Sequence, residues 1–330
     1  MASRRDFLKL LAVAGAASGT TLAGLHFNNQ PIKVTETRLL MGTIVNLTVV
    51  GGSESEARQV VNRCLNRMAD LEAVFSRFNP DSALSKLNNE GCLINPPGEL
   101  VEVLYTAESI SLVTDGAYDV TVKPLYDVYR GSSMEGELPP NEAVAAAQHL
   151  VDHSRLQISE TVISFGVSGM AVTLDSIAKG YIIDRGVSIL KDNGYTNVLV
   201  EAGGDLMASG TDGVDDNWQI GVMSPRNGSS KLYGKFGVVD RAVASSGDYF
   251  QYFSPDMKNH HIIDPRTGYS SPDLSGATVF APNCMEADGF STALMVISPN
   301  EGIELIESQP GFEAVLFTKD LQALRTSGLS

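Results

Sequence analysis

Apolar residues recur along this chain with two spacings, one typical of helices and the other of strands. Residues 57–71 carry hydrophobic side chains at a helical period, and Ser53 and Glu56 form a capping box in front of them. The segment 31–50 instead has no helical period and is rich in β-branched residues, and the alternation of Thr43, Val45, Leu47 and Val49 with their neighbours predicts a strand. The same reasoning predicts helices over residues 99–114, 141–151, 175–191, 284–297 and 300–307.

Short runs rich in β-branched residues lie between these helices. They predict strands over residues 156–158, 162–165, 171–174, 197–201, 278–281 and 314–318, with several more between 206 and 253. Residues 75–88 are expected to be mostly loop with a short helical turn, and residues 131–140 to be a polar loop. Because helices and strands do not alternate strictly, the fold class is expected to be α+β, with mixed, mainly antiparallel sheets and flanking helices. No repeat or proline-rich linker divides the chain, so we expect a single domain.

The first residues have the features of an export signal. Arg4 and Arg5 stand within Ser-Arg-Arg-Asp-Phe-Leu-Lys, and an uncharged stretch of weak hydrophobicity follows over residues 10–25. This run resembles the twin-arginine signal. We therefore expect residues 1–23 to be the signal and 24–330 the domain. The expected location is the periplasm, or the inner membrane if the signal is not cleaved.

Composition and charge narrow the range of possible functions. Of 330 residues, 43% are hydrophobic and 19% charged, which is normal for a globular protein. Lys and Arg number 24 against 39 Asp and Glu, a net charge of −15. A nucleic-acid partner is not expected, because such proteins carry a basic surface. The three cysteines lack the spacing of a zinc site.

Four segments carry residues suited to chemistry. Asp288 and Thr292 are four residues apart on a predicted helix, so their oxygens share one face and could hold Mg²⁺. Taken alone, this pair fits better with a carboxylate at a helix start and a hydroxyl bonded to its own helix. The second segment, around Lys179, opens a helix whose N-terminus can bind phosphate. Adjacent histidines, His260 and His261, precede a turn in the third.

The fourth segment places Tyr118 and Asp119 just after a helix, where an aromatic ring and a carboxylate could contact a flat ligand. It also admits a simpler interpretation, a buried tyrosine at the end of a helix. The pair Gly203 and Gly204 likewise permits a close backbone approach or simply forms a turn.

Eight motifs in order resemble one known family. They are Met41-Gly42-Thr43, Phe75-Ser76-Arg77-Phe78 with Asp81-Ser82 and Leu84-Ser85, Gly116 through Thr121, Leu174 through Tyr181, Gly203-Gly204-Asp205, Ser245 through Tyr249, His261 through Gly268, and Ala287-Asp288 through Thr292. Together they resemble the ApbE-type FAD:protein FMN transferases over nearly the whole domain. Ser245 is a departure, because the family more often has Thr there.

The resemblance implies a reaction and a set of site residues. FAD is the FMN donor and Mg²⁺ the cofactor; a Thr or Ser hydroxyl of an acceptor protein attacks the FMN phosphorus and AMP leaves. The acceptor is expected to be an electron-transfer protein with a Ser/Thr-Gly-Ala-Thr motif. The implied Mg²⁺ ligands are Asp288, Thr292 and the carbonyl of Ala178, and the implied base is His261. The implied flavin-nucleotide contacts are Met41, Ala83, Tyr118, Asp119, Asp175, Lys179, Tyr181 and Ile262.

Two other functions stay open at this stage. Water in place of the acceptor hydroxyl would make the protein an FAD pyrophosphatase that yields FMN and AMP. A passive exported flavin-binding protein would need neither His261 nor a metal site. A further hypothesis comes from Ser275-Gly276-Ala277-Thr278, which resembles the acceptor motif, so Thr278 could be modified by the protein itself.

Overall fold

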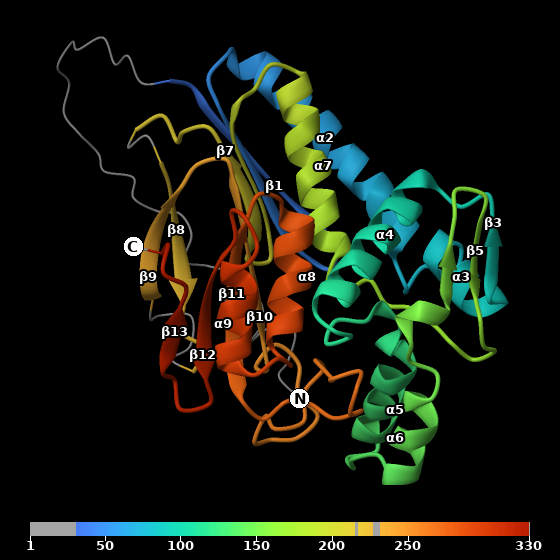
Figure 1. The fold of residues 1–330 in the computed structure, drawn as a ribbon. Helices are drawn as coiled ribbons and strands as arrows, with labels where there is room; N and C mark the ends of the chain where they lie inside the picture. Colours follow the sequence, from blue (N-terminus) through green and yellow to red (C-terminus); the bar gives the residue numbers. More distant parts are fainter. Residues whose placement is uncertain (1–30, 215–216, 227–231, 330) are drawn as a thin grey trace, which may run out of the picture.

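An eight-stranded antiparallel sheet forms the centre of the protein (Figure 1). The structure is a computed structural model that describes residues 31–214, 217–226 and 232–329, so the predicted export signal lies outside it. In spatial order the strands are β1 (Lys33–Leu40), β2 (Thr43–Val50), β6 (Asn197–Ala202), β7 (Asp205–Ser209), β10 (Arg241–Gly247), β11 (Leu274–Ala281), β12 (Glu313–Thr318) and β13 (Ala323–Arg325). The α+β class and the antiparallel pairing are as predicted.

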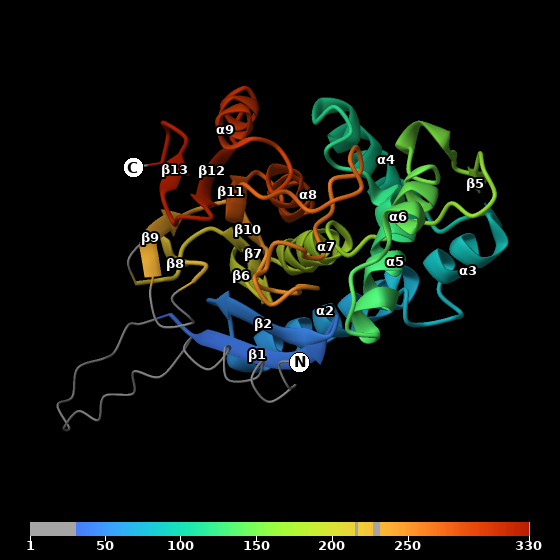
Figure 2. The same cartoon turned by 90° about the horizontal axis from the view of Figure 1, so that it is seen from below.

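Different elements cover the two faces of this sheet (Figure 2). On one face lie α2 (Glu54–Phe75), α7 (Ala178–Asp192) and α8 (Cys284–Leu294), with α7 in contact with both of the others. The opposite face packs against the hairpin of β8 (Trp218–Met223) and β9 (Leu232–Val238) through buried residues such as Trp218 and Phe280. Helix α9 (Pro299–Glu307) connects α8 to β12.

A smaller group of elements extends from the helical layer. It contains α3 (Ala83–Glu90), α4 (Gly98–Val113), α5 (Lys123–Met134) and α6 (Asn141–Gln148). A three-stranded sheet completes it, in the order β3 (Cys92–Ile94), β5 (Val162–Phe165) and β4 (Leu156–Ile158). Two short 3₁₀ turns, η1 (Val120–Val122) and η2 (His153–Arg155), join these pieces. No helix among the described residues is long and apolar enough to span a bilayer.

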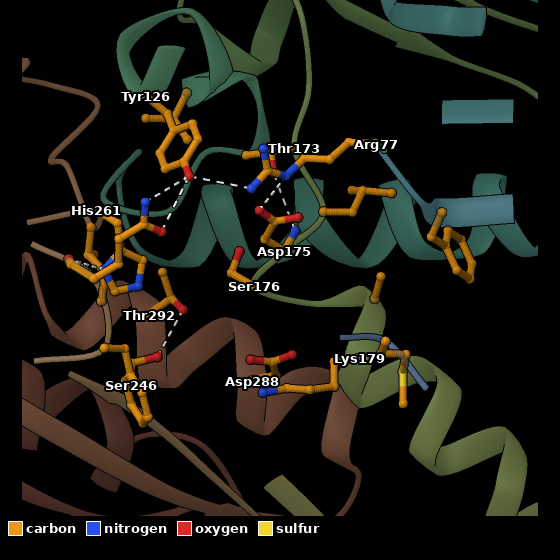
Figure 3. A pocket seen from close by; sticks show the side chains of 18 of the residues that line it. Arg77, Tyr126, Thr173, Asp175, Ser176, Lys179, Ser246, His261, Asp288 and Thr292 are labelled. Carbon is orange, nitrogen blue, oxygen red and sulfur yellow. Dashed lines mark hydrogen bonds and ion pairs between the residues drawn. The ribbon is translucent and has the colours of Figure 1, made fainter. Parts of the chain in front are cut away.

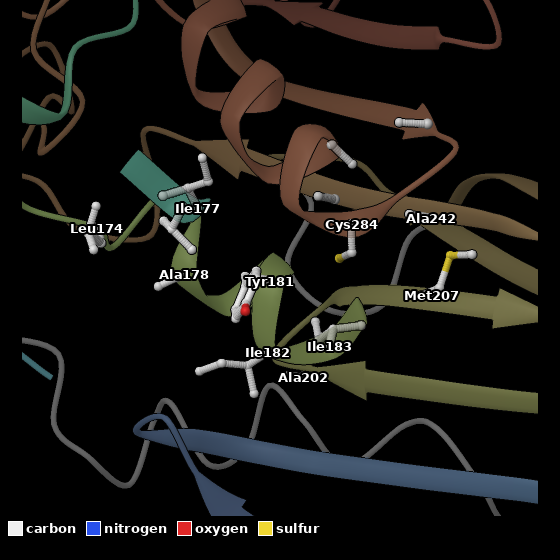
Figure 4. Packing of buried hydrophobic residues seen from close by; sticks show 14 of the residues in the cluster. Leu174, Ile177, Ala178, Tyr181, Ile182, Ile183, Ala202, Met207, Ala242 and Cys284 are labelled. Carbon is white, nitrogen blue, oxygen red and sulfur yellow. The ribbon is translucent and has the colours of Figure 1, made fainter. Parts of the chain in front are cut away.

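The contact between α7 and α8 is unusually close. A Cβ atom on Gly180 would lie 2.3 Å from the carbonyl oxygen of Cys284, so only glycine allows this approach. Asp184, one turn further along α7, accepts hydrogen bonds of 2.8 Å from the backbone N–H groups of Cys284 and Met285. It thus caps the first turn of α8. Figure 4 shows Ile182 and the surrounding apolar side chains that hold α7 on the sheet.

The structure confirms most predicted elements and corrects others. The capping box holds, since Ser53 accepts from the N–H of Glu56 at 3.3 Å. The strand predicted from residues 43–49 is β2, and β1 before it completes a hairpin; the short helical turn expected within residues 75–88 is the start of α3, which extends to Glu90. Residues 171–174 are not a strand, because among the described residues no neighbouring strand pairs with them. Helix α5 was not predicted, and nor were the three-residue strands β3 and β13.

We predict that Gly180→Ala destabilises the protein. The added methyl group meets backbone atoms, which cannot rotate away, so α7 and α8 must separate. Overpacking of this kind costs about 1–3 kcal/mol, and urea denaturation would measure it. Gly131→Ala in α5 is the matched control, because nothing lies within 4 Å of its Cβ position. Equal stability of the two variants would contradict the prediction.

Candidate active site

A cavity of about 530 Å³ opens where the helical layer meets the smaller group of elements. Its walls come from the β1–β2 turn, the end of α2, the start of α7, the end of β10 and α8. The segment 250–265, which precedes β11, closes another side. Segments far apart in the sequence therefore converge on one space, and Figure 3 shows the polar side chains that they contribute.

Asp288 and Thr292 project from α8 into this cavity (Figure 3). Asp288 is 5% exposed, and its Oδ2 accepts a hydrogen bond of 3.3 Å from the N–H of Gly180. Burial and the nearby Asp205 carboxylate raise the pKa of Asp288 to about 8. The close approach of α7 at Gly180 thus brings the first turn of one helix to the carboxylate of the other.

Charge in this part of the cavity is not balanced. The Nζ of Lys179 lies 2.5 Å from Oδ2 of Asp205, which is 1% exposed. Burial lowers the pKa of Lys179, but Asp205 and Asp288 more than offset this and raise it above the usual value. Two buried carboxylates therefore share one ammonium group. With Lys179 paired to Asp205, the raised pKa of Asp288 shows that its ionised form lacks a counter-charge. A hard divalent cation that displaces the carboxyl proton, next to the hydroxyl of Thr292, would supply that charge.

His261 stands on the opposite side of the cavity from Lys179 (Figure 3). Its Nδ1 is 2.9 Å from the backbone carbonyl of Gln251. A carbonyl can only accept, so Nδ1 carries the proton and neutral Nε2 offers a lone pair; it has no partner among the described residues. Burial lowers the pKa of His261 below 6.5, partly opposed by the bond to Gln251. His260 points elsewhere: it is fully buried, and burial lowers its pKa to about 4.

A chain of polar contacts crosses the mouth of the cavity. The Nε of Arg77 is 2.8 Å from Asp175, and its guanidinium lies between the rings of Phe78 and Tyr126, with centres 4.4 and 5.1 Å away. The hydroxyl of Tyr126 in turn accepts from the side chain of Gln251 at 3.2 Å. Since the carbonyl of Gln251 binds His261, these contacts connect the rim around Asp175 to the imidazole.

The β1–β2 turn contributes a buried polar atom without a partner. Thr43 is 8% exposed, and its hydroxyl has no hydrogen bond among the described residues. A Cβ on Gly203 would lie 2.7 Å from this hydroxyl, so glycine keeps the space beside it open. Met41, in the same turn, has a φ of +53°, which is rare for a residue with a side chain. An unpaired hydroxyl at a cavity wall is a ready contact for a ligand.

Most residues predicted for the site lie around this cavity. Those that line it are Met41, Tyr118, Asp119, Asp175, Ala178, Lys179, His261, Ile262, Asp288 and Thr292. The carboxylate of Asp119 also accepts hydrogen bonds from Thr121 and His153, so it holds its own loop in place.

Two predicted residues lie outside the cavity wall. Tyr181 is 2% exposed, its ring packs edge-on against Phe75 at 5.5 Å, and its hydroxyl donates to Glu102. Ala83 is the first residue of α3 and packs against the apolar core. Both belong to the surrounding framework in this structure.

Some cavity residues were absent from the predicted set. Thr43, Arg77 and Ser246 lie inside motifs that the sequence analysis had singled out, so a signal for them existed. Tyr126 and Gln251 lie outside every such motif. They reach the cavity through α5 and the segment before β11, whose positions the sequence pattern did not predict.

The donors available for a metal are few but chemically consistent. Among the described residues, no group of three or more His, Cys, Asp or Glu side chains could hold an ion. The alternative set is one carboxylate, Asp288, one hydroxyl, Thr292, and a backbone carbonyl at Ala178, which lines the same cavity. Such a set contains only hard oxygens and suits Mg²⁺ with its remaining positions filled by substrate or water.

Comparison with known proteins shows the family to which this chain belongs. The model of the ApbE family matches residues 41–316. The chain belongs to the ApbE family. FAD:protein FMN transferase from Haemophilus influenzae is 33% identical over 253 residues, covering 73% of each chain, and the one from Escherichia coli K12 is 26% identical, covering 95% of this chain and 94% of that one.

Solved structures of the ApbE family agree. The flavin transferase ApbE from Vibrio cholerae has a TM-score of 0.77 at 26% identity and covers 90% of this chain and 98% of its own. The apo flavinyl transferase ApbE from Pseudomonas stutzeri has a TM-score of 0.75 at 27% identity, covering 90% and 96%. The likeness in fold therefore covers nine-tenths of this chain in both cases.

The structure argues against self-modification at Thr278. This residue lies within β11, which pairs with β10 on one side and β12 on the other. It is 4% exposed, and its hydroxyl is 2.9 Å from that of Ser245. Ser-Gly-Ala-Thr is here a paired strand of the central sheet.

Proposed function

We propose that this protein is an FAD:protein FMN transferase. It transfers FMN from FAD to a Thr or Ser hydroxyl of an acceptor protein and releases AMP. Membership of the ApbE family and relatives that bear this name support the proposal. The observation that carries it is that one cavity contains the carboxylate of Asp288, the hydroxyl of Thr292 and the imidazole of His261. The Nδ1 of His261 is bonded to a carbonyl, which leaves the lone pair of Nε2 available.

The side-chain oxygens of Asp288 and Thr292 on α8 form the centre of the proposed metal site. Asp288, Thr292 and the carbonyl of Ala178 would hold Mg²⁺, which neutralises charge on the pyrophosphate of FAD when bound. Lys179 supplies a fixed positive charge beside it, already oriented by Asp205. Catalysis of phosphoryl transfer depends mainly on such positioning and neutralisation, so these residues need no covalent role.

His261 is the proposed general base. Its Nε2 takes the proton of the attacking hydroxyl, while Nδ1–H stays bonded to the carbonyl of Gln251. A bond forms between the acceptor oxygen and the FMN phosphorus. The bond from that phosphorus to the bridging oxygen breaks, and this oxygen leaves as part of the phosphate of AMP.

The flavin nucleotide is proposed to occupy the rest of the cavity. Met41, Tyr118, Asp119, Asp175 and Ile262 would contact it. We add Thr43, whose unpaired hydroxyl is available to donate a hydrogen bond.

The setting of the reaction extends the proposal. An acceptor with a Ser/Thr-Gly-Ala-Thr-like motif, of the electron-transfer class, would reach the cavity from its open side. The twin-arginine-like start of the chain supports a periplasmic location or an attachment to the inner membrane through the signal.

We expect Asp288→Ala to abolish metal-dependent transfer. The mature protein would be incubated with FAD, Mg²⁺ and a domain bearing the acceptor motif, followed by intact mass spectrometry and chromatography of AMP and FMN. The wild type should give an FMN adduct and AMP, and chelator or Asp288→Ala should remove both. The exposed Asp70→Ala on α2 is the control and should keep full activity. AMP and free FMN without an adduct would indicate a pyrophosphatase, and unchanged bound FAD a passive carrier.

Thr43→Val should weaken FAD binding without destabilising the free protein. Loss of the hydroxyl leaves an atom of bound FAD unpaired, so FAD affinity should fall roughly tenfold. The free protein should be as stable as before or slightly more so, because the hydroxyl has no partner to lose. Calorimetric titration and thermal denaturation would measure the two effects. Thr48→Val is the matched control on β2: it breaks the 2.9 Å contact with Thr35 and should leave FAD affinity unchanged.

The pH dependence of transfer should reflect His261. Its pKa lies below 6.5, so the base is neutral at pH 7. At saturating Mg²⁺, which would keep Asp288 ionised in spite of its raised pKa, the rate should be flat above pH 6.5 and fall only below it. His261→Asn, which can still donate to Gln251, should lose about 100-fold or more in rate while keeping FAD bound. His149→Asn, on the exposed end of α6, is the control. A rate that still rises between pH 7 and 8 through a single ionisation would contradict this assignment.

A further inference from the structure

Three hydroxyl groups form a buried chain between β10 and α8. The hydroxyl of Ser246 lies 3.1 Å from that of Thr292 and 2.8 Å from that of Ser291. The hydroxyl of Ser291 in turn donates to the backbone carbonyl of Asp288 at 2.9 Å. Ser246 is 9% exposed and Ser291 is fully buried, so the chain is shielded from bulk water. Figure 3 shows the contact between Ser246 and Thr292.

The end of this chain sets the direction of every hydrogen bond in it. A carbonyl oxygen only accepts, so the single proton of Ser291 is used on Asp288. Ser291 must then accept from Ser246, which uses the proton of Ser246. Ser246 must accept from Thr292 in its turn. This arrangement, in which Thr292 donates to Ser246, Ser246 to Ser291 and Ser291 to the carbonyl of Asp288, is the only placement of the three protons that satisfies all three contacts.

The direction has a consequence for Thr292. Its proton points at Ser246 on the cavity wall and is used in that hydrogen bond, and both lone pairs of its oxygen stay free. A hydroxyl binds a cation through a lone pair, and a proton facing the cation would repel it. A bound cation would also make the hydroxyl a stronger donor to Ser246, since polarisation is passed along such chains.

We propose that Ser246 is a positioning residue that holds the lone pairs of Thr292 toward the metal. This inference rests on the proposed function, because it assumes the Mg²⁺ site at Asp288 and Thr292. The neighbouring Ser245 offers a contrast, since its hydroxyl bonds to Thr278 within the sheet and makes no hydrogen bond to α8 among the described residues. Of these two serines at the end of β10, only Ser246 makes hydrogen bonds from its hydroxyl to residues of α8.

Metal affinity is the measurement that tests this role. Mn²⁺ binding to the full protein would be followed by electron paramagnetic resonance, with displacement by Mg²⁺, for Ser246→Ala, Ser246→Thr and Ser291→Ala. Outer contacts to metal ligands usually change affinity by 10- to 100-fold, so Ser246→Ala should weaken Mn²⁺ binding about tenfold. Ser246→Thr keeps the hydroxyl and should restore it. Ser291→Ala, which frees only the far end of the chain, should give a smaller loss.

A general loss of packing would give a different result. Ser111→Ala in α4 removes another fully buried serine hydroxyl, one bonded only to the carbonyl of Ala107, and should leave Mn²⁺ affinity unchanged. In transfer assays, Ser246→Ala should require more Mg²⁺ for half-maximal rate but approach the wild-type rate at saturation. FAD binding without metal should be unaffected.

The outcomes distinguish this inference from the proposed function. Equal Mn²⁺ affinity of Ser246→Ala and wild type, with transfer intact, overturns the role of Ser246 alone. A parallel loss of metal-free FAD binding also overturns it, because the residue would then act through packing. If the wild type binds no Mn²⁺ and transfers FMN without metal, the metal part of the proposed function fails and this inference fails with it.

Discussion

The close contact of α7 with α8 is the constraint on which the site depends. At Gly180 the backbone of α7 lies so near the carbonyl of Cys284 that no side chain fits between them. Asp184 caps the first turn of α8 from the same helix, and Gly180 donates to Asp288. Two helices distant in the sequence are thereby held in one register, with Ala178 and Thr292 on the same cavity.

This contact brings together two buried acidic side chains for which the free protein supplies one ammonium group as counter-charge. Asp205 and Asp288 are both nearly buried, and Lys179 is the ammonium group that they share. The raised pKa of Asp288 expresses the energetic cost of that arrangement. A protein gains nothing in stability from such a cluster, which is typical of functional sites, where a ligand completes the charge balance. The positive φ of Met41 on another wall is a second local cost at the same cavity.

Local patterns in the sequence predicted most of the helices and strands but few of the contacts between them. The capped helix α2 and the strand β2 follow from short-range periodicity, whereas α5 was missed because its buried residues Leu125, Tyr126 and Tyr129 span little more than one turn before Gly131. Asp288 and Thr292 share a helix face, so their proximity could be predicted from spacing. The contacts of Gly180 with Asp288 and of Ser246 with Thr292 join residues 108 and 46 positions apart, which no local pattern reveals. Family resemblance supplied the grouping that periodicity could not.

The strand β11 shows why a short motif is insufficient for reactivity. Its Ser-Gly-Ala-Thr has the composition expected of an acceptor, yet β10 and β12 occupy its backbone on both sides and Ser245 binds the Thr278 hydroxyl. In the proposed mechanism an acceptor hydroxyl has to reach Nε2 of His261, and the Thr278 hydroxyl, buried in a paired strand, does not line that cavity. The enzyme can therefore carry the motif without modifying itself. If the proposed acceptor motif is correct, the same comparison predicts that acceptors are selected by exposure of the hydroxyl as well as by sequence, since Thr278 has the sequence but is 4% exposed.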